Sequence, residues 1–94
     1  MADAASTLRI DKLLWYLRFA KSRSIAQAQC EAGLIRLNGR RIERAHIMVR
    51  AGDILTLPWR GAARVVRIGA LPVRRGPPAE AQICYEEMPS DASG

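Results

Sequence analysis

The feature that most constrains this fold is the dipeptide Asn38-Gly39, which lies between two short stretches of alternating apolar and charged residues. Asn-Gly in this setting is the strongest local signal for a two-residue β-hairpin, because both residues accept a left-handed backbone. The register that follows pairs Leu37 with Arg40, Arg36 with Arg41, and Ile35 with Ile42. One pair joins two arginines, and like charges opposite each other destabilise a sheet. The hairpin therefore favours a nearby anion.

Two helices are predicted before this hairpin. The first starts near residue 8, with Ser6 or Thr7 as its N-cap. Its apolar positions recur at helical spacing, and they are Ile10, Leu13, Leu14 and Leu17. Its other flanks mix charged and aromatic residues, namely Arg9, Asp11, Lys12, Trp15, Tyr16, Arg18 and Phe19. For Trp15 and Tyr16 we favour core packing over base stacking.

The second helix is short and lies between residues 22 and 33. Its N-cap is either Ser22 or Ser24, the latter with Gln27 in a capping box, and Gly33 ends it. Its predicted buried stripe consists of small residues and one larger one, namely Ile25, Ala28 and Ala32. Small residues allow a close, helix-turn-helix-like pair. Lys21 and Arg23 flank the helix N-terminus, which is a favourable place for phosphate.

Short strands follow the hairpin. We expect a turn at 51–53, a strand at 54–57 ended by Pro58, a turn at 59–62, and a longer strand over 63–71. The sequence predicts a basic, proline-containing loop over 72–78. It predicts a short helix or an irregular arm over 79–87. The prediction is one α+β domain at 8–71, two packed helices against a small, mostly antiparallel sheet. A C-terminal loop and arm at 72–88 follows, with disordered ends at 1–7 and 89–94.

The charge of the chain is positive and uneven. The net charge is +6, and every cation except Lys12 and Lys21 is arginine, whose planar fork binds phosphate with two hydrogen bonds. Residues 9–50 carry +7 and 51–75 carry +4, whereas 76–94 carry −4. This distribution favours a polyanionic partner over ordinary solvated surface charge.

The sequence shows no pattern typical of catalysis or metal binding. Cys30 and Cys84 are far apart and form no CxxC motif, so we expect both to be reduced, without a disulfide or a zinc site. His46 is the single histidine and is predicted in a loop. No signal peptide or membrane-spanning run is visible. We therefore expect a soluble, cytoplasmic, monomeric protein without metal or cofactor.

Two stretches of the chain resemble a known family. The stretch "RIDKLLWYLRFAKSRSIAQAQCEAGLIRLNGRRI", continued through "VRAGDIL", resembles the RNA-binding domain first named from ribosomal small-subunit protein four, the S4 domain or alpha-L motif. The later "RRGPPAEAQICYEE" is similar to the segment that follows this domain in the bacterial heat shock protein 15 family. The resemblance thus extends over nearly the whole chain.

This resemblance implies a ribosome-associated, non-enzymatic RNA-binding factor. Its relatives attach to large ribosomal subunits that carry a stalled nascent chain on tRNA and assist their recycling. The RNA-contacting residues that it implies here are Arg9, Lys12, Arg18, Lys21, Ser22, Arg23, Arg36, Asn38, Arg40 and Arg41. The chain departs from the family at its end, where the acidic "YEEMPSDASG" replaces a longer basic extension.

Two other functions stay open from the residues alone, and a third is disfavoured. A basic face can bind an acidic protein, and a helix-turn-helix-like pair can enter the major groove of DNA. Similar domains also occur in RNA-modifying enzymes, but the length leaves no room for a catalytic domain.

Overall fold

The computed structural model describes residues 6–89. The helices are α1 (Ile10–Tyr16), α2 (Arg23–Glu31) and α3 (Pro78–Gln82). The strands are β1 (Leu8–Arg9), β2 (Arg36–Leu37), β3 (Arg40–Arg41), β4 (Met48–Val49), β5 (Ile54–Trp59), β6 (Ala62–Ile68) and β7 (Tyr85–Met88). Most of the two ends that were predicted to be disordered, residues 1–5 and 90–94, lies outside the described residues.

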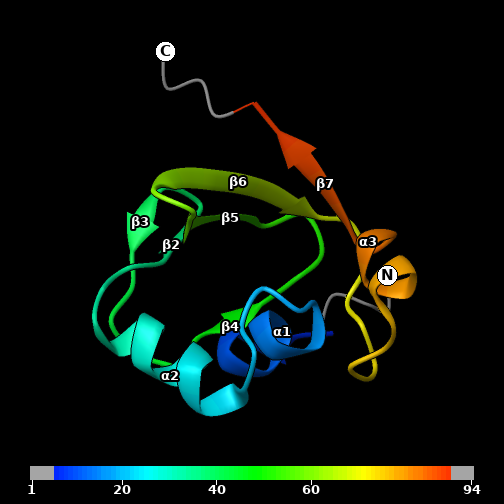
Figure 1. Cartoon of the computed structure of the whole chain (residues 1–94), viewed down its shortest axis with the longest axis horizontal. Helices are drawn as coiled ribbons and strands as arrows, with labels where there is room; N and C mark the ends of the chain where they lie inside the picture. The colour runs from blue at the N-terminus through cyan, green and yellow to red at the C-terminus, as the bar shows by residue number, and fades with distance from the viewer. Residues whose placement is uncertain (1–5, 90–94) are drawn as a thin grey trace.

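The molecule is an antiparallel sheet with a helix pair on one side. The five-stranded sheet has the order β3-β2-β5-β6-β7, and β1 pairs with β4 in a second, two-stranded sheet. Helices α1 and α2 lie together beneath the larger sheet, and α3 lies beside the start of β7 (Figure 1). The predicted α+β class, with two packed helices against a small antiparallel sheet, is confirmed.

Helix α1 buries the predicted apolar face but starts differently. Ile10, Leu13, Leu14 and Leu17 are all at most 2% exposed, as the helical spacing predicted. The predicted cap at Ser6 or Thr7 is wrong, because Arg9 is the N-cap and gives no side-chain cap. The backbone supplies the partner instead, since the amide of Ile10 donates to the carbonyl of Ile47 at 2.8 Å. The pairing of β1 with β4 thus replaces a local cap.

Helix α2 is capped as predicted but faces the core differently. The Ser22 hydroxyl accepts from the amide of Ile25, and Gly33 ends the helix region at φ +76°. The predicted stripe is wrong, because Ile25, Ala28 and Ala32 are exposed. Ala26 and Cys30 are buried instead. Gln27, which adjoins this face, donates to the buried Asp11 on α1.

The hairpin forms in the predicted register, with Arg36 opposite Arg41 and Leu37 opposite Arg40. Strand β5 continues through Pro58, which corrects the predicted end at this residue. Strand β2 pairs only with Leu55 and Thr56, so Pro58 pairs with β6 on one side and has no neighbouring strand on the other. Proline is tolerated at such an open edge because it has no backbone N–H to donate. The turn after Trp59 is confirmed.

Three further features depend on contacts that are distant in the sequence. Strand β7 pairs with β6, and β4 pairs with β1; the sequence predicted neither strand. Phe19, predicted on an exposed flank, is only 8% exposed, because the chain turns at Arg18 and leaves the helix. Trp15 and Tyr16 are half-buried and outside the core cluster, so the core packing favoured for them is wrong.

Candidate nucleic-acid interface

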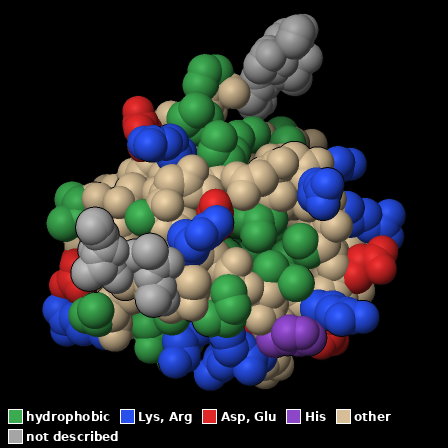
Figure 2. All heavy atoms as spheres, turned by 180° about the vertical axis from the view of Figure 1, so that it is seen from behind, with side chains coloured by type: hydrophobic (Ala, Val, Ile, Leu, Met, Phe, Trp, Pro, Cys, Tyr) green, Lys and Arg blue, Asp and Glu red, His purple; other side chains and the backbone are tan. Residues whose placement is uncertain are grey.

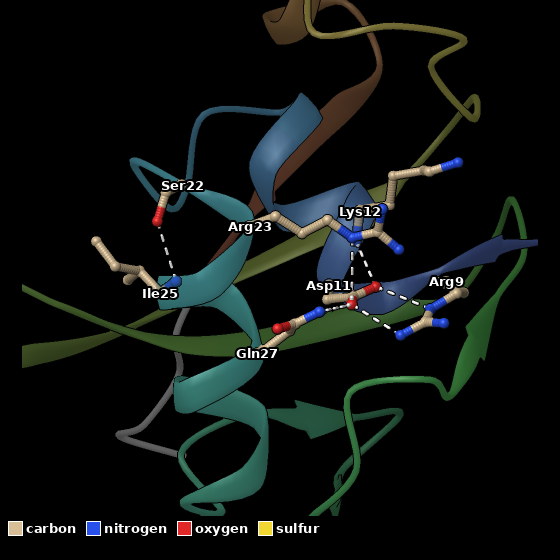
Figure 3. Close-up of polar contacts among 7 residues, drawn as sticks. All are labelled: Arg9, Asp11, Lys12, Ser22, Arg23, Ile25 and Gln27. Carbon is tan, nitrogen blue, oxygen red and sulfur yellow. Dashed lines mark hydrogen bonds and ion pairs between the residues drawn. The ribbon is translucent and has the colours of Figure 1, made fainter.

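The carboxylate of Asp11 is the centre of a polar cluster between α1 and α2 (Figure 3). Its side chain is fully buried. Arg9 donates to both of its oxygens, at 2.9 and 3.2 Å. Gln27 donates at 2.9 Å and Arg23 at 3.4 Å, while the backbone amide of Lys12 donates at 2.8 Å. A single acid therefore holds two arginines from different elements.

The charge on Asp11 is stabilised by these partners. Burial by itself raises the pKa of this carboxyl, but the hydrogen bonds from Gln27 and Arg9 and the charges of Arg23 and Arg9 outweigh burial. The pKa therefore lies below its usual value, and Asp11 stays ionised. The side chains of Arg9 and Arg23 remain 42% and 37% exposed, so both are available to a second anion.

The burial of Asp11 corrects the predicted exposed flank of the first helix. One signal in the sequence points to it. Asp11 is the sole acid between Asp3 and Glu31, a stretch that holds five cations. An isolated acid among cations is well placed to organise them.

Apart from Arg18, the other predicted residues of the helix pair are close in sequence to the members of this cluster. Ser22 accepts from the amide of Ile25 at 3.1 Å, so its hydroxyl serves as the cap of α2. The ammonium of Lys12 lies 5.9 Å from the ring centroid of Tyr16. Lys21 is exposed just before the cap. The start of α2, the positive end of the helix dipole, thus lies beside the cations Lys21 and Arg23.

The hairpin arginines are mostly exposed and avoid each other by taking separate partners. Arg36 donates to the carbonyl of Gly39 at 3.3 Å, and Arg41 forms a 3.3 Å ion pair with Glu43. The Arg41 side chain also packs over Gly33, where an added Cβ would lie 2.5 Å from its Nε. These separate partners explain how the like-charged cross-strand pair is tolerated.

Asn38 has a structural role in addition to its place in the turn, where its φ is +53°. Its amide nitrogen donates to Asp53 at 3.1 Å, and its amide oxygen accepts from the backbone of Ile54 at 2.8 Å. Both polar atoms are therefore used to connect the hairpin turn to the start of β5.

Arg18 does not join the Asp11 cluster. It follows α1 with a left-handed backbone, φ +67°, and its Nε donates to the carbonyl of Gly76 at 2.7 Å. Arg75 makes the reciprocal contact to the carbonyl of Trp15 at 3.1 Å. The two arginines attach the C-terminal loop to the end of α1.

One open hollow lies between the Asp11 cluster and the segment that follows the hairpin. It has a volume of about 380 Å³, and its lining includes Arg9 and Gln27 from the Asp11 cluster together with Glu43, the partner of Arg41. Arg44 also lines it; this residue was not among the predicted contacts. Figure 2 shows one face with Lys and Arg side chains along its lower and right-hand margins and apolar side chains between them.

Within the described residues, the potential metal ligands are dispersed and both thiols are buried. No group of three or more His, Cys, Asp or Glu side chains within residues 6–89 could hold a metal ion. Cys30 and Cys84 are buried free thiols, and burial raises the pKa of Cys30 to about 11 and also raises that of Cys84. In the same part of the chain, no helix is long and apolar enough to cross a membrane.

Comparison with known proteins identifies the domain that holds these cations. The profile of the S4 domain matches residues 8–55, which run from the start of β1 into β5 and include α1, α2 and the hairpin. This chain belongs to the S4 domain family. The S4 domain thus holds every predicted contact residue, and β6, α3 and β7 follow it.

Relatives named heat shock protein 15 resemble the chain beyond its S4 domain. The homolog from Haemophilus influenzae is 38% identical over 93% of this chain and 66% of its own length. Heat shock protein 15 of Escherichia coli K12 is 37% identical over 88% of this chain and 62% of its own length. This chain therefore spans less than two thirds of the length of these curated relatives.

A solved structure agrees with the fold around the S4 domain. Heat shock protein 15 of Vibrio cholerae, described as trimeric, superposes with a TM-score of 0.85 and 31% identity, over 94% of this chain and 88% of that one. A second kind of relative, small ribosomal subunit protein uS4 of Solidesulfovibrio magneticus, is 33% identical over 85% of this chain and 39% of its length. The monomeric state predicted for this chain stays a prediction.

Proposed function

We propose that this protein binds structured RNA through one surface of its S4 domain, here called the S4 face. We define the S4 face by Arg9, Lys12, Lys21, Arg23, Arg36, Arg40 and Arg41. The observation that carries the proposal is the buried Asp11, which holds Arg9 and Arg23 side by side at the start of α2 while leaving both partly exposed. A buried acid that organises exposed cations is typical of a preformed anion site.

The other predicted residues have supporting roles in this proposal. Ser22 positions the start of α2 and Asn38 positions the hairpin, because their polar atoms are used in the fold. Arg18 acts elsewhere, because it points to the C-terminal loop. The S4 face recognises the shape of the RNA through its phosphates and 2′-hydroxyl groups, and it does not read the base sequence.

The RNA that we propose is ribosomal. The support is the name of the uS4 relatives and the similarity to heat shock protein 15. The finer proposal is a non-enzymatic factor that binds the large subunit when a nascent chain is stalled on tRNA, and that assists its recycling. Crosslinking in bacterial lysate followed by sequencing of the attached RNA tests it. Enrichment of large-subunit ribosomal RNA is expected, and a spread of unrelated messages would contradict the ribosomal target.

Removing the cross-strand arginine pair tests the S4 face. We expect Arg36→Ala with Arg41→Ala to leave the fold intact, because both side chains are mostly exposed and like charges are removed from one sheet position. Affinity for a structured RNA should fall, and the slope of log K against log[salt] should decrease by about two, roughly one for each lost phosphate contact. Filter binding over a salt series measures both quantities.

The matched control is Arg67→Ala with Arg74→Ala. These arginines are also exposed, at 51% and 64%, but lie outside the S4 domain. This double variant removes the same charge as Arg36→Ala with Arg41→Ala, but it should lower the RNA affinity less. Equal effects of the two double variants would contradict a specific S4 face. Competition with duplex DNA, and co-purification after nuclease treatment, separate RNA binding from binding of DNA or of an acidic protein.

A further inference from the structure

A second hollow lies outside the Asp11 cluster and the hairpin. It is open and has a volume of about 430 Å³, within the range of small-molecule sites. We call it the aromatic hollow and define it by Phe19, Trp59, Tyr85, Arg18, Arg60 and Arg64. These residues come from the segment after α1, the end of β5 and the turn that follows it, β6 and β7. Only Arg18 belongs to the predicted contact residues.

Three rings and one arginine build a rigid wall of this hollow. The centroid of Phe19 lies 4.9 Å from that of Tyr85 and 6.4 Å from that of Trp59. The guanidinium of Arg64 lies over all three rings, 4.6 Å from the Trp59 centroid, and is bound to Glu87. Trp59 and Tyr85 are only half-buried, so part of each ring faces the opening.

The rim of the hollow carries two arginines with unusual backbones. Arg18 has φ +67° and Arg60 has φ +51°. Glycine or asparagine adopts this left-handed region with less strain than arginine does. Asn38 is the one other residue besides glycine with positive φ within residues 6–89. For Arg60 the turn between β5 and β6 is the cause, because a two-residue hairpin turn requires positive φ at both Arg60 and Gly61. Both arginine side chains line the hollow.

The charges of the hollow are complementary to a nucleotide. Its one acidic neighbour among the described ion pairs, Glu87, is bound to Arg64. Arg18 contacts the neutral carbonyl of Gly76, and Arg60 lies 5.8 Å over the Trp59 ring. Neither rim arginine has an acidic partner within residues 6–89. An aromatic wall beside two such cations is the usual way to bind an unpaired base and its phosphates.

We propose that the aromatic hollow receives an unpaired RNA base, which replaces Arg60 over the Trp59 ring, while Arg60 and Arg18 contact the adjoining phosphates. This inference rests on the proposed function, because it adds a second contact for an RNA that the S4 face holds. The two contacts differ in what they bind: the S4 face binds the backbone of paired RNA, and the hollow binds one base outside the pairs.

The test uses the full chain and two RNA hairpins that differ only in an unpaired 3′ extension. Arg60→Asn should weaken binding of the extended hairpin about tenfold and leave the paired hairpin nearly unchanged; asparagine suits the left-handed backbone, so the turn is kept. Arg67→Gln is the matched control, because it removes one charge from β6 outside the hollow. Arg60→Asn effects that are equal for the two hairpins would overturn the proposal.

A second experiment measures the fluorescence of Trp59 directly. In a Trp15→Phe background Trp59 is the single tryptophan, and a short oligouridylate should quench its fluorescence. No quenching at saturation, or equal quenching by polyglutamate, would overturn the proposal; the second result would assign the hollow to an acidic protein segment. This readout separates the two sites. Suppose that oligouridylate quenches Trp59 while the Arg36→Ala, Arg41→Ala variant binds RNA with unchanged affinity. That combination would reject the S4 face and support base binding in the aromatic hollow.

Discussion

At the scale of single residues, Asp11 has the largest structural consequence. Its burial would be costly without partners, and five hydrogen bonds from four residues, none longer than 3.4 Å, offset that cost. The same bonds direct Arg9 and Arg23 toward a common place. Asp11 is therefore a positioning residue, which acts on a ligand through the arginines that it holds.

Replacing Asp11 by asparagine should remove much of the acid sensitivity of the fold. Because the pKa of Asp11 is lowered in the folded protein, its ionised form adds stability above the usual aspartate pKa, and this stability is lost as the pH falls through the lowered value. We expect Asp11→Asn to cost about 2 kcal/mol at neutral pH.

The measurement is the free energy of unfolding by denaturant at pH values from neutral to strongly acidic. The difference between the original protein and Asp11→Asn should shrink as the pH falls below the aspartate range. A constant difference at all pH values would show that the charge of Asp11 is not the source of the stability.

At the scale of elements, α2 joins the core to the S4 face. Its inner side holds Ala26 and Cys30, and Gln27 reaches Asp11. Its start is set by one hydroxyl, that of Ser22. The orientation of Arg23, the first residue of the helix, therefore depends on the cap.

The cap can be tested by comparing two neighbouring serines. We expect Ser22→Ala to lower the free energy of unfolding by about 1 kcal/mol, because an amide of the first turn loses its partner. Ser24→Ala should change it by less than about 0.5 kcal/mol, because Ser24 is exposed and the cap is made by Ser22. Thermal unfolding of both variants measures this. Equal losses would place the cap at both serines.

At the scale of the whole molecule, acids near the C-terminus pair with three of the five arginines that follow the S4 domain. Glu80 pairs with Arg74, Glu86 with Arg67 and Glu87 with Arg64. Within the S4 domain, by contrast, the described ion pairs use only Asp11 and Glu43 as acids. The net positive charge is thereby concentrated on the S4 domain, which favours binding of a polyanion there.

Removing two of these acids should therefore reduce the difference in net charge between the S4 domain and the segment that follows it. Glu80→Gln with Glu86→Gln frees Arg74 and Arg67 while keeping Glu87 at the aromatic hollow. We expect a higher affinity for any nucleic acid at low salt and a salt slope steeper by up to about two. Binding of RNA and duplex DNA over a salt series measures this. An unchanged slope would mean that the acids do not shield these arginines from a ligand.

The sequence by itself determined the features that depend on neighbouring residues. Asn38-Gly39 set the hairpin and its register, and helical spacing identified the buried side of α1. Gly33 marked the end of α2, and the start was narrowed to Ser22 or Ser24. These signals are local because turns, caps and helical faces are decided within a few residues.

Only the tertiary structure decided the rest. The burial of Asp11, the strands β4 and β7, the inner side of α2 and the turning away of Arg18 each depend on partners that are distant in the chain. Such partners leave no periodic signal, since a short strand or a buried acid is stabilised by what packs against it. Which cations share a surface is therefore a property of the folded chain.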